Sequence, residues 1–384
     1  MVMGKLAGVV WDDTLLGYDM GADHPLNPVR LDLTMGLARA LGVLDGVEPV
    51  KPARATEDEV LRVHSAEYIA AVKAAPESPV DVGHGLGTPD NPVFAGMHEA
   101  ASLVLGSSLA AAELLLSGET DRVVNIGGGL HHAMRDGAAG FCVYNDCVGA
   151  IDRLLDRGIE RVAYVDTDVH HGDGVQAAFY DDPRVLTISL HQHPATLFPG
   201  TGYARELGAG DGYGMSVNLP LPPGTTDEHW LRAFHAVVPS LLRAFRPQVL
   251  VTQCGVDTHR DDPLAHLGLT VDGHRAIYQA LRELAIEHGG RWLAVGGGGY
   301  QLRRVVPRSW THLLATALDR DLPVRTELPG DWAQRLGVPD MTDGGGTSFL
   351  PWSGGGGDPV DMAVLGTRRA AFPLYGLDPD DPRD

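Results

Sequence analysis

The feature that most constrains the fold is a regular alternation of short apolar runs with longer helical patterns. Strands are predicted at residues 122–127, 161–166, 185–191, 247–255 and 291–297, and helices at 99–117, 146–157, 227–245 and 272–288. Such alternation is typical of a mostly parallel sheet with helices on both faces. Because no repeat and no long linker interrupts it, we expect one α/β domain over residues 1–384. The Gly- and Pro-rich tail over 340–384 is expected to be irregular.

Unusual polar residues follow four of these predicted strands. The strand ends read GGGLHH at 127–132, TDVHHGDG at 167–174, VDTH at 256–259 and GGGGY at 296–300. In open α/β sheets, ligands bind in the crevice beyond the carboxyl ends of the strands. Because these ends meet at one edge of a parallel sheet, we expect their His, Asp and Tyr side chains to form a single site.

The second of these strand ends has the residue types of a metal site. Asp166, Asp168 and His170 occupy alternate positions, so an extended chain projects all three from one face. A carboxylate and an imidazole suit Zn²⁺ or Fe²⁺, and an open catalytic site has three protein ligands. Asp257, just after a predicted strand, is the best-placed third ligand. The alternative is that the aspartates cap helix termini and the histidines make only local hydrogen bonds.

The other strand ends carry candidate proton-transfer groups. His131 and His132 can serve as general bases, as metal ligands or as hydrogen-bonding residues. With Asp166 and Asp173 as partners they would form two Asp–His dyads, in which a carboxylate at Nδ1 raises the basicity of Nε2. Tyr300 follows four glycines, where its hydroxyl could donate to a carbonyl oxygen that develops negative charge. Tyr300 as a plain packed aromatic is the alternative.

Composition excludes several classes of protein. The net charge of −20, with no stretch rich in Lys and Arg, argues against nucleic acid as a partner and is compatible with cationic partners. Three cysteines, no signal-peptide pattern and no apolar run of about 20 residues favour a cytoplasmic protein that does not span a membrane. Walker A, HExxH and GxSxG motifs are absent, and the glycine runs do not fit a dinucleotide fingerprint.

Seven stretches of the chain occur in the order in which one enzyme family carries them. They are HPLNPVR (24–30), DNPVF (90–94), GGGLHHAMRDGAAGFCVYND (127–146), YVDTDVHHGDGVQAAFY (164–180), ISLHQHPATLFPGTG (188–202), QCGVDTHRDDPL (253–264) and GGGGY (296–300). With them the chain resembles the histone deacetylase superfamily, in particular its bacterial acetoin-utilisation-type members, over roughly residues 20–320.

The resemblance implies a single-domain arginase/deacetylase-type fold of three layers, with a mostly parallel central sheet and one catalytic metal, usually zinc. It also assigns a role to each polar residue at the strand ends. His132 is expected to act as the general base and acid, and His131 as its electrostatic partner, although the motifs do not decide between the two. The implied metal ligands are Asp168, His170 and Asp257, and the implied catalytic residues are His131, His132, Tyr300, Asp166 and Asp173.

A narrow channel for an acyl-lysine side chain is a further implication of the resemblance. Phe141 and Phe198 are similar to its two aromatic walls, and Asp90 to the rim aspartate that holds the substrate backbone. Arg30 matches the arginine of an internal channel that releases acetate. The implied substrate-binding residues are Phe141, Phe198, Asp90, Gly140 and Leu264.

The resemblance implies a structural K⁺ as well, held by backbone oxygens around Asp166, Asp168 and His170 together with the Ser189 region. Two other histidines of these stretches are not assigned to the reaction. For His171 we expect a structural hydrogen-bonding role. His193 is expected to be a solvated loop residue, with a polar contact at the channel mouth as the alternative.

Together these expectations define a zinc-dependent deacetylase that hydrolyses the acetamide of N-acetyl-lysine in proteins. A small-molecule amidohydrolase, such as an acetylpolyamine deacetylase, is the alternative, and the net charge of −20 is compatible with it. A non-enzymatic metal-binding protein on the same fold is a third hypothesis, against which the complete set of chemical positions argues. The substrates are therefore expected to be acetylated protein lysines or acetylated amines, and the oligomeric state is left open.

Overall fold

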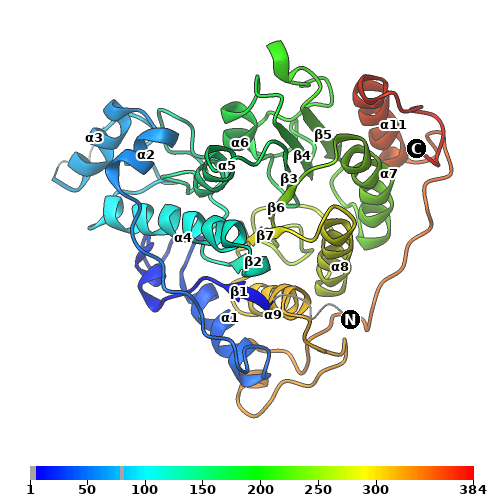
Figure 1. Ribbon diagram of the computed structural model, residues 1–384. Coiled ribbons are helices and arrows are strands. Elements are labelled where there is room, and N and C mark those ends of the chain that lie inside the picture. Colours follow the sequence, from blue (N-terminus) through cyan, green and yellow to red (C-terminus); the bar gives the residue numbers. More distant parts are fainter. Residues whose placement is uncertain (1–5, 78–81) are drawn as a thin grey trace.

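The computed structural model describes residues 6–77 and 82–384 (Figure 1). The strands are β1 (Leu6–Val9), β2 (Thr120–Asn125), β3 (Val162–Asp166), β4 (Val185–Gln192), β5 (Ser216–Leu221), β6 (Val249–Gln253) and β7 (Trp292–Val295). The helices are α1 (Val29–Ala40), α2 (Glu57–Val63), α3 (Ala66–Ala74), α4 (Met97–Ser117), α5 (Asp146–Asp156), α6 (Asp173–Ala178), α7 (Asp227–Phe245), α8 (Val271–Glu287), α9 (Val306–Ala317), α10 (Trp332–Leu336) and α11 (Pro359–Ala371). Each strand and helix predicted from the sequence is present, with ends that agree to within about two residues.

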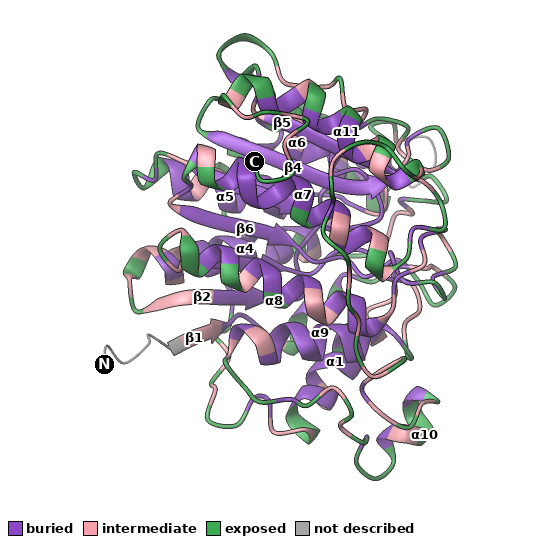
Figure 2. Ribbon diagram, turned by 90° about the vertical axis from the view of Figure 1, so that its right-hand side faces the viewer, coloured by how far each residue is buried: buried purple, intermediate pink, exposed green. Residues whose placement is uncertain are grey.

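The strands form one sheet in the order β1-β2-β7-β6-β3-β4-β5, and every neighbouring pair is parallel. All residues of β3 to β7 are buried, and β4, β5 and β6 appear purple in Figure 2. Burial on both faces explains why they read as nearly continuous apolar runs in the sequence. The α/β fold with a parallel central sheet is therefore confirmed.

Helices cover both faces of this sheet (Figure 1). On one face α4 packs against β2 and α5, while α2 packs against α5 and α3 against α4. On the other face α1, α9, α8 and α7 pack side by side in that order. The result is the three-layer arrangement that was expected, and it leaves the ends of the strands free to carry a site.

Helix α4 is long and apolar enough to cross a membrane when it is judged by length and composition alone. The prediction that no apolar run reaches this length is therefore wrong for α4. However, 67% of its apolar window is buried inside the protein, where the helix packs against β2 and α5. Packing in the core accounts for an apolar surface of this kind.

The sequence analysis missed both edge strands, β1 and β5, and several helices, among them α11. Helix α11 packs against α7 and β5, and Thr367 Oγ1 donates a hydrogen bond of 2.8 Å to the carbonyl of Asn218. The prediction of an irregular tail is therefore wrong for residues 359–375, whereas residues 344–357 do lack helix and strand. Because α11 lies along β5, it shields an edge of the sheet that would otherwise be open to other chains.

Arg368 of α11 holds the C-terminal segment together. Its guanidinium is buried between the rings of Trp352 and Phe372, at 4.5 and 4.1 Å from their centroids. The guanidinium nitrogens donate to backbone carbonyls of the segment, those of Asp378, Pro379, Asp381 and Asp384. They also donate to the carbonyl of Ala236 in α7. A planar group with five donors suits such a cluster of acceptors.

Replacing Arg368 by alanine is expected to lower the free energy of unfolding by about 3 kcal/mol or more, because several hydrogen bonds to a charged group are lost together. Chemical denaturation of the two proteins measures the difference. Arg369→Ala is the matched control, since Arg369 makes only an exposed ion pair with Asp380, and we expect less than about 1 kcal/mol there. Equal losses for the two variants would contradict this role of Arg368.

Candidate active site

Asp168, His170 and Asp257 come together beyond the ends of β3 and β6. Their ligand atoms all lie within 4.8 Å of one another, and all three residues are buried. The Nδ1 atom of His170 is 3.1 Å from Asp168 Oδ1 and 3.1 Å from Asp257 Oδ2. The three ligands predicted from the sequence therefore form one cluster, and this group can hold a metal ion.

Two observations indicate that this cluster suits a bound cation. Burial and the neighbouring carboxylate of Asp168 raise the pKa of Asp257 to about 7, a cost that a bound cation would offset. The backbone also approaches the carboxylates closely. A Cβ on Gly298 would lie 1.9 Å from Asp257 Oδ2, and one on Gly255 would lie 2.1 Å from Asp168 Oδ2. Glycine is therefore required at both positions for the carboxylates to converge.

Neighbouring donors orient the two carboxylates. Gln253 Nε2 and the backbone N–H of Gly298 each donate to Asp168 Oδ2 at 2.7 Å, and the N–H of Val169 donates to Asp257 Oδ1 at 2.9 Å. Such contacts hold metal ligands in the geometry that binding needs. The sequence analysis assigned no role to Gln253. Its place as a buried amide on the last residue of β6 is the signal that could have found it.

His131 and His132 form the two dyads that were expected. The Nδ1–H of His131 donates to Asp166 Oδ2 at 2.7 Å, and that of His132 donates to Asp173 Oδ1 at 2.7 Å. The two Nε2 atoms are 3.0 Å apart, on the side of each ring away from its partner Asp166 or Asp173. The hydroxyl of Tyr164 also donates to Asp166 Oδ2 at 2.7 Å, a contact that the sequence analysis missed.

The two histidines differ in their electrostatics. Burial lowers the pKa of His131, but the carboxylates of Asp166 and Asp168 outweigh it and raise the pKa to about 9. Burial and the neighbouring His131 lower the pKa of His132 to about 4. Near neutral pH the pair therefore combines a protonated His131 with a neutral His132. Two protonated imidazoles in contact repel each other, so protonation of one lowers the pKa of the other.

Asn145 links the dyads to the fold. Its side chain caps the start of α5 by accepting from the N–H of Val148, and it donates to the carbonyls of His131 and Ala133. One side chain therefore ties the segment that carries both histidines to a helix of the core.

Tyr300 lines the same pocket as His132 and His170. Its backbone N–H donates to Asp262 Oδ2 at 2.8 Å, and its ring meets the ring of Phe141 edge to face at a centroid distance of 5.5 Å. Burial raises the pKa of Tyr300 well above its usual value, so the hydroxyl keeps its proton and remains a donor. Asp262 is another residue without an assigned role in the sequence analysis, although its stretch was part of the resemblance.

These groups surround a pocket of about 200 Å³. Aromatic and aliphatic side chains form its walls, and Phe198, at 45% exposure, stands at its mouth. All five predicted substrate-binding residues line it, and Leu197, which was not predicted, joins them. The lining residues are Asp90, His132, Gly140, Phe141, His170, Leu197, Phe198, Leu264 and Tyr300.

Gly140 brings the backbone of this wall close to both His132 and Phe198. Its φ is +51°, and a Cβ there would lie 2.4 Å from His132 Cδ2 and 3.0 Å from Phe198. We expect Gly140→Ala to push the His132 ring out of place and to lower kcat by about 100-fold, because a displacement of 1 Å can cost that much. Steady-state kinetics on protein of unchanged metal content provides the measurement. An unchanged kcat would show that the ring of His132 need not be held in this position.

A smaller space shares part of its lining with the pocket, and its other lining residues include Leu26, Gly129, Leu130 and Cys142. Arg30 lines neither of these two cavities. Its Nη1 donates to the carbonyls of Gly297 and Gly299 at 2.7 and 3.2 Å, so it supports the glycine turn before Tyr300. The role of Arg30 in acetate release therefore stays a prediction.

The remaining predicted residues have the following places. Asp166 of β3 is paired in register with Ser189 of β4, which brings together the two segments predicted to hold K⁺. His171 is a structural hydrogen-bonding residue, as expected, because its ring nitrogens contact Thr201 Oγ1 at 2.8 Å and Gln176 Oε1 at 3.0 Å. His193 lies in a loop and does not line the pocket.

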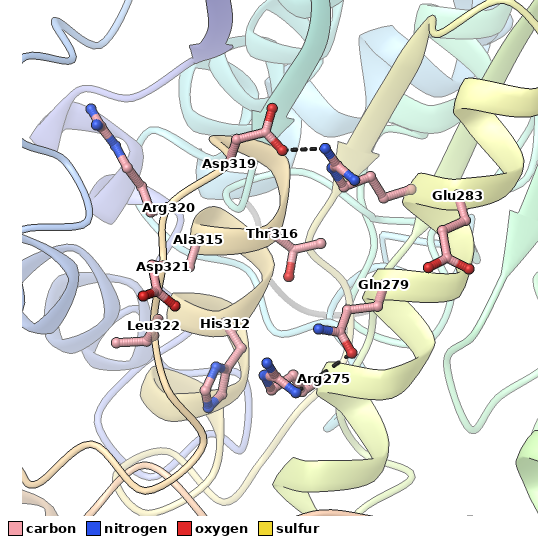
Figure 3. A pocket seen from close by; sticks show the side chains of 11 residues that line it. Arg275, Gln279, Glu283, His312, Ala315, Thr316, Asp319, Arg320, Asp321 and Leu322 are labelled. Carbon is pink, nitrogen blue, oxygen red and sulfur yellow. Dashed lines mark hydrogen bonds and ion pairs between the residues drawn. The ribbon is translucent and has the colours of Figure 1, made fainter.

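Another pocket, of about 500 Å³, lies between α8 and α9 (Figure 3). Arg275 and His312 face each other there, and Arg282 forms an ion pair with Asp319. Asp319 also pairs with Arg122 of β2 at 2.5 Å. None of the predicted site residues lines this pocket, and it offers no cluster of metal ligands. It is therefore not the candidate active site.

Comparison with known proteins shows the family of the chain. A model of the histone deacetylase domain matches residues 24–317. Acetoin utilization protein AcuC of Bacillus subtilis (strain 168) is 44% identical over 320 residues, which cover 82% of each chain. AcuC of Staphylococcus aureus (strain MRSA252) is 37% identical over 332 residues, which cover 85% of each.

Solved structures show the same relationship. The crystal structure of an HDAC homolog from Aquifex aeolicus has a TM-score of 0.84 at 29% identity, and the match covers 94% of this chain and 100% of that one. An HDAC homolog complexed with SAHA also has a TM-score of 0.84, at 30% identity, with 96% of this chain and 100% of that one covered.

The chain belongs to the histone deacetylase family, a family of deacetylating hydrolases. Within this family it is an AcuC-like member.

Proposed function

We propose that this protein is a zinc-dependent protein lysine deacetylase of the cytoplasm. The observation that carries the proposal is the narrow apolar pocket of about 200 Å³ in which His132, His170 and Tyr300 meet. Acetyl-lysine has an apolar stem that ends in a neutral amide, and this combination matches apolar walls with polar groups at one end. The membership in the deacetylase family supports the same reaction class.

Asp168, His170 and Asp257 would hold the metal, which we propose to be Zn²⁺, with Fe²⁺ as the alternative. When bound, such an ion supplies a Lewis acid that polarises a carbonyl and lowers the pKa of a water molecule. The protein itself keeps the two carboxylates in place. Gln253 and Gly298 donate to Asp168, and the N–H of Val169 donates to Asp257.

His132 is proposed to move the proton. Because Asp173 accepts from its Nδ1–H, its Nε2 carries the lone pair and can take a proton from the attacking water. The same proton then passes to the amine nitrogen as the carbon–nitrogen bond of the amide breaks, so the free amine leaves together with acetic acid, which loses its remaining proton to water to become acetate. His131, 3.0 Å away and oriented by Asp166, would serve as the electrostatic partner of His132.

Tyr300 is proposed to donate its hydroxyl hydrogen bond to the carbonyl oxygen as negative charge develops there. The hydrogen bond from its backbone to Asp262 holds the residue in position. Phe141 and Phe198 would flank the lysine stem, with Gly140 and Leu264 completing the wall.

At the mouth of the pocket Asp90 would accept from the substrate backbone. We also propose that Arg30 acts in acetate release and that K⁺ binds beside Asp166 and Ser189. The paired positions of Asp166 and Ser189 support the K⁺ proposal.

A comparison of two substrates tests the proposal. Zinc-loaded protein is given an acetyl-lysine peptide or N-acetylputrescine, with a hydroxamate inhibitor as the control for turnover at the metal. We expect the higher kcat/KM with the peptide. A clear preference for N-acetylputrescine, which the charge of −20 would favour, would replace the proposal by a small-molecule amidohydrolase. No hydrolysis of either would favour a non-enzymatic metal-binding protein.

A further inference from the structure

We propose that Asp343 is a positioning residue of the active site. It lies in the C-terminal segment, beyond the residues 24–317 that match the histone deacetylase domain. Its carboxylate holds the loop that carries Asp257 and, through Asp262, the residue Tyr300. The inference rests on the proposed function for these two residues and adds a part of the chain that the family match does not include.

The carboxylate of Asp343 accepts from two side chains that belong to different elements. Its Oδ2 is 2.8 Å from His259 Nε2, and its Oδ1 is 2.8 Å from Arg308 Nη2. Oδ2 also accepts from the N–H of Val271 at 3.0 Å, at the start of α8. His259 and Arg308 are almost completely buried, so these contacts are shielded from water.

His259 follows Asp257 by two residues and organises the loop after it. Its Nδ1 accepts from the N–H of Asp261 at 3.0 Å, so its Nε2 carries the hydrogen that is donated to Asp343. Its backbone carbonyl accepts from the N–H of Asp262 at 2.9 Å. The ring of His259 is therefore held on both sides, by the loop itself and by Asp343.

The same loop also holds Tyr300 through a hydrogen bond. Asp262 Oδ2 accepts from the backbone N–H of Tyr300 at 2.8 Å. A shift of His259 would therefore move Asp257 at one end of the loop and the anchor of Tyr300 at the other. Even a small displacement of these groups matters, because catalytic groups and metal ligands must lie within a few tenths of an ångström of their working positions.

Arg308 connects Asp343 to the segment that follows Tyr300. It lies in α9, and its Nε donates to the carbonyl of Arg304 at 2.5 Å, in the turn that leads from Tyr300 into the helix. Its Nη1 donates to the carbonyl of Thr342 at 2.9 Å. Thr342 and Asp343 therefore connect the loop after β6 and the turn after β7 to the same part of the C-terminal segment.

The C-terminal segment is itself held firmly enough to act as an anchor. Asp272 near the start of α8 accepts from Thr342 Oγ1 at 2.6 Å, from the N–H of Asp343 at 3.1 Å and from the N–H of Gly344 at 2.8 Å. The N–H of Gly345 donates in turn to Thr342 Oγ1 at 2.6 Å. These contacts hold the segment that carries the carboxylate of Asp343 in position.

Asp343→Asn tests this role, because it keeps the size of the side chain and removes one of two acceptor oxygens. We expect the affinity of the metal-free protein for Zn²⁺ and the kcat/KM of the zinc-loaded protein each to fall by about 10- to 100-fold. Zinc affinity is measured by competition with a chromophoric chelator, which needs no substrate. Both measurements are made below the unfolding temperature of the variant.

Asp358→Asn is the matched control. Asp358 belongs to the same C-terminal segment, caps α11 and pairs with Arg232, but it does not contact the loop after β6. We expect a loss of thermal stability with unchanged zinc affinity and kcat/KM. His259→Gln provides a second variant that breaks the same contact from the other side, and combining it with Asp343→Asn should add little to either single loss.

The proposal is overturned if Asp343→Asn behaves like Asp358→Asn, with lower stability and full zinc affinity. It is also overturned if the losses of Asp343→Asn and His259→Gln simply multiply in the double variant. If the wild-type protein proves inactive on acetylated substrates, the proposed function fails, while the zinc-affinity comparison still decides whether Asp343 positions the metal ligands.

Discussion

His170→Ala is expected to remove the metal and reduce deacetylation by about a thousandfold or more. His170 Nδ1 lies between the two carboxylates of the cluster and would be the only nitrogen ligand of a metal held by these three residues. Without it, Asp168 and Asp257 are two buried carboxylates that repel each other, and the site loses one of three ligands. A Lewis acid contributes several kcal/mol to the stabilisation of the transition state, and about 4 kcal/mol corresponds to a thousandfold in rate.

Metal analysis of the purified variant and its rate of acetate release measure this effect together. His229→Ala is the control, because His229 lies on α7 and contacts Thr226 and Asp358, away from the cluster. The His229→Ala variant should bind about one equivalent of zinc, as we expect of the wild type. If His170→Ala kept its zinc and its activity, the ion would have to bind elsewhere.

Tyr300→Phe is expected to lower kcat by about 100- to 1000-fold, the cost of removing one donor to a developing oxyanion. The backbone contact to Asp262 and the ring contact with Phe141 do not involve the hydroxyl. Folding, zinc content and KM should therefore change little. Steady-state kinetics together with thermal unfolding separates the loss of a donor from a loss of structure.

Either of two results would count against this role of Tyr300. An unchanged kcat would leave the carbonyl polarised by other groups alone. An equal loss for Tyr300→Phe in kcat and in zinc affinity would mean that the hydroxyl supports the metal site and does not act on the substrate.

The core of the fold and the contents of the site could be predicted from the sequence because both depend on short segments. A buried parallel strand is a short apolar run, and its polar end is visible as a break in that run. Asp166, Asp168 and His170 lie within five positions of one another. Because the strands are parallel, Asp257 and Tyr300 lie at the same edge of the sheet as these residues. Residues that are far apart in the sequence therefore form one site.

What could not be predicted depends on contacts between distant parts of the chain. His259 and Asp343 are 84 positions apart, and no local pattern marks Asp343 as a partner. Asp262 and Gln253 are common polar residues whose roles appear only when Tyr300 and Asp168 lie beside them. Helix α11 follows a glycine-rich stretch, and its place along β5 depends on tertiary packing.

A zinc titration of the metal-free protein tests the central claim most directly, with acetate release from an acetyl-lysine peptide as the signal. The account predicts that activity is absent without metal, rises in proportion to added Zn²⁺ and reaches a plateau at about one equivalent, as three ligands at one site imply. Full activity in the metal-free protein, or none at a saturating concentration of zinc, would contradict it.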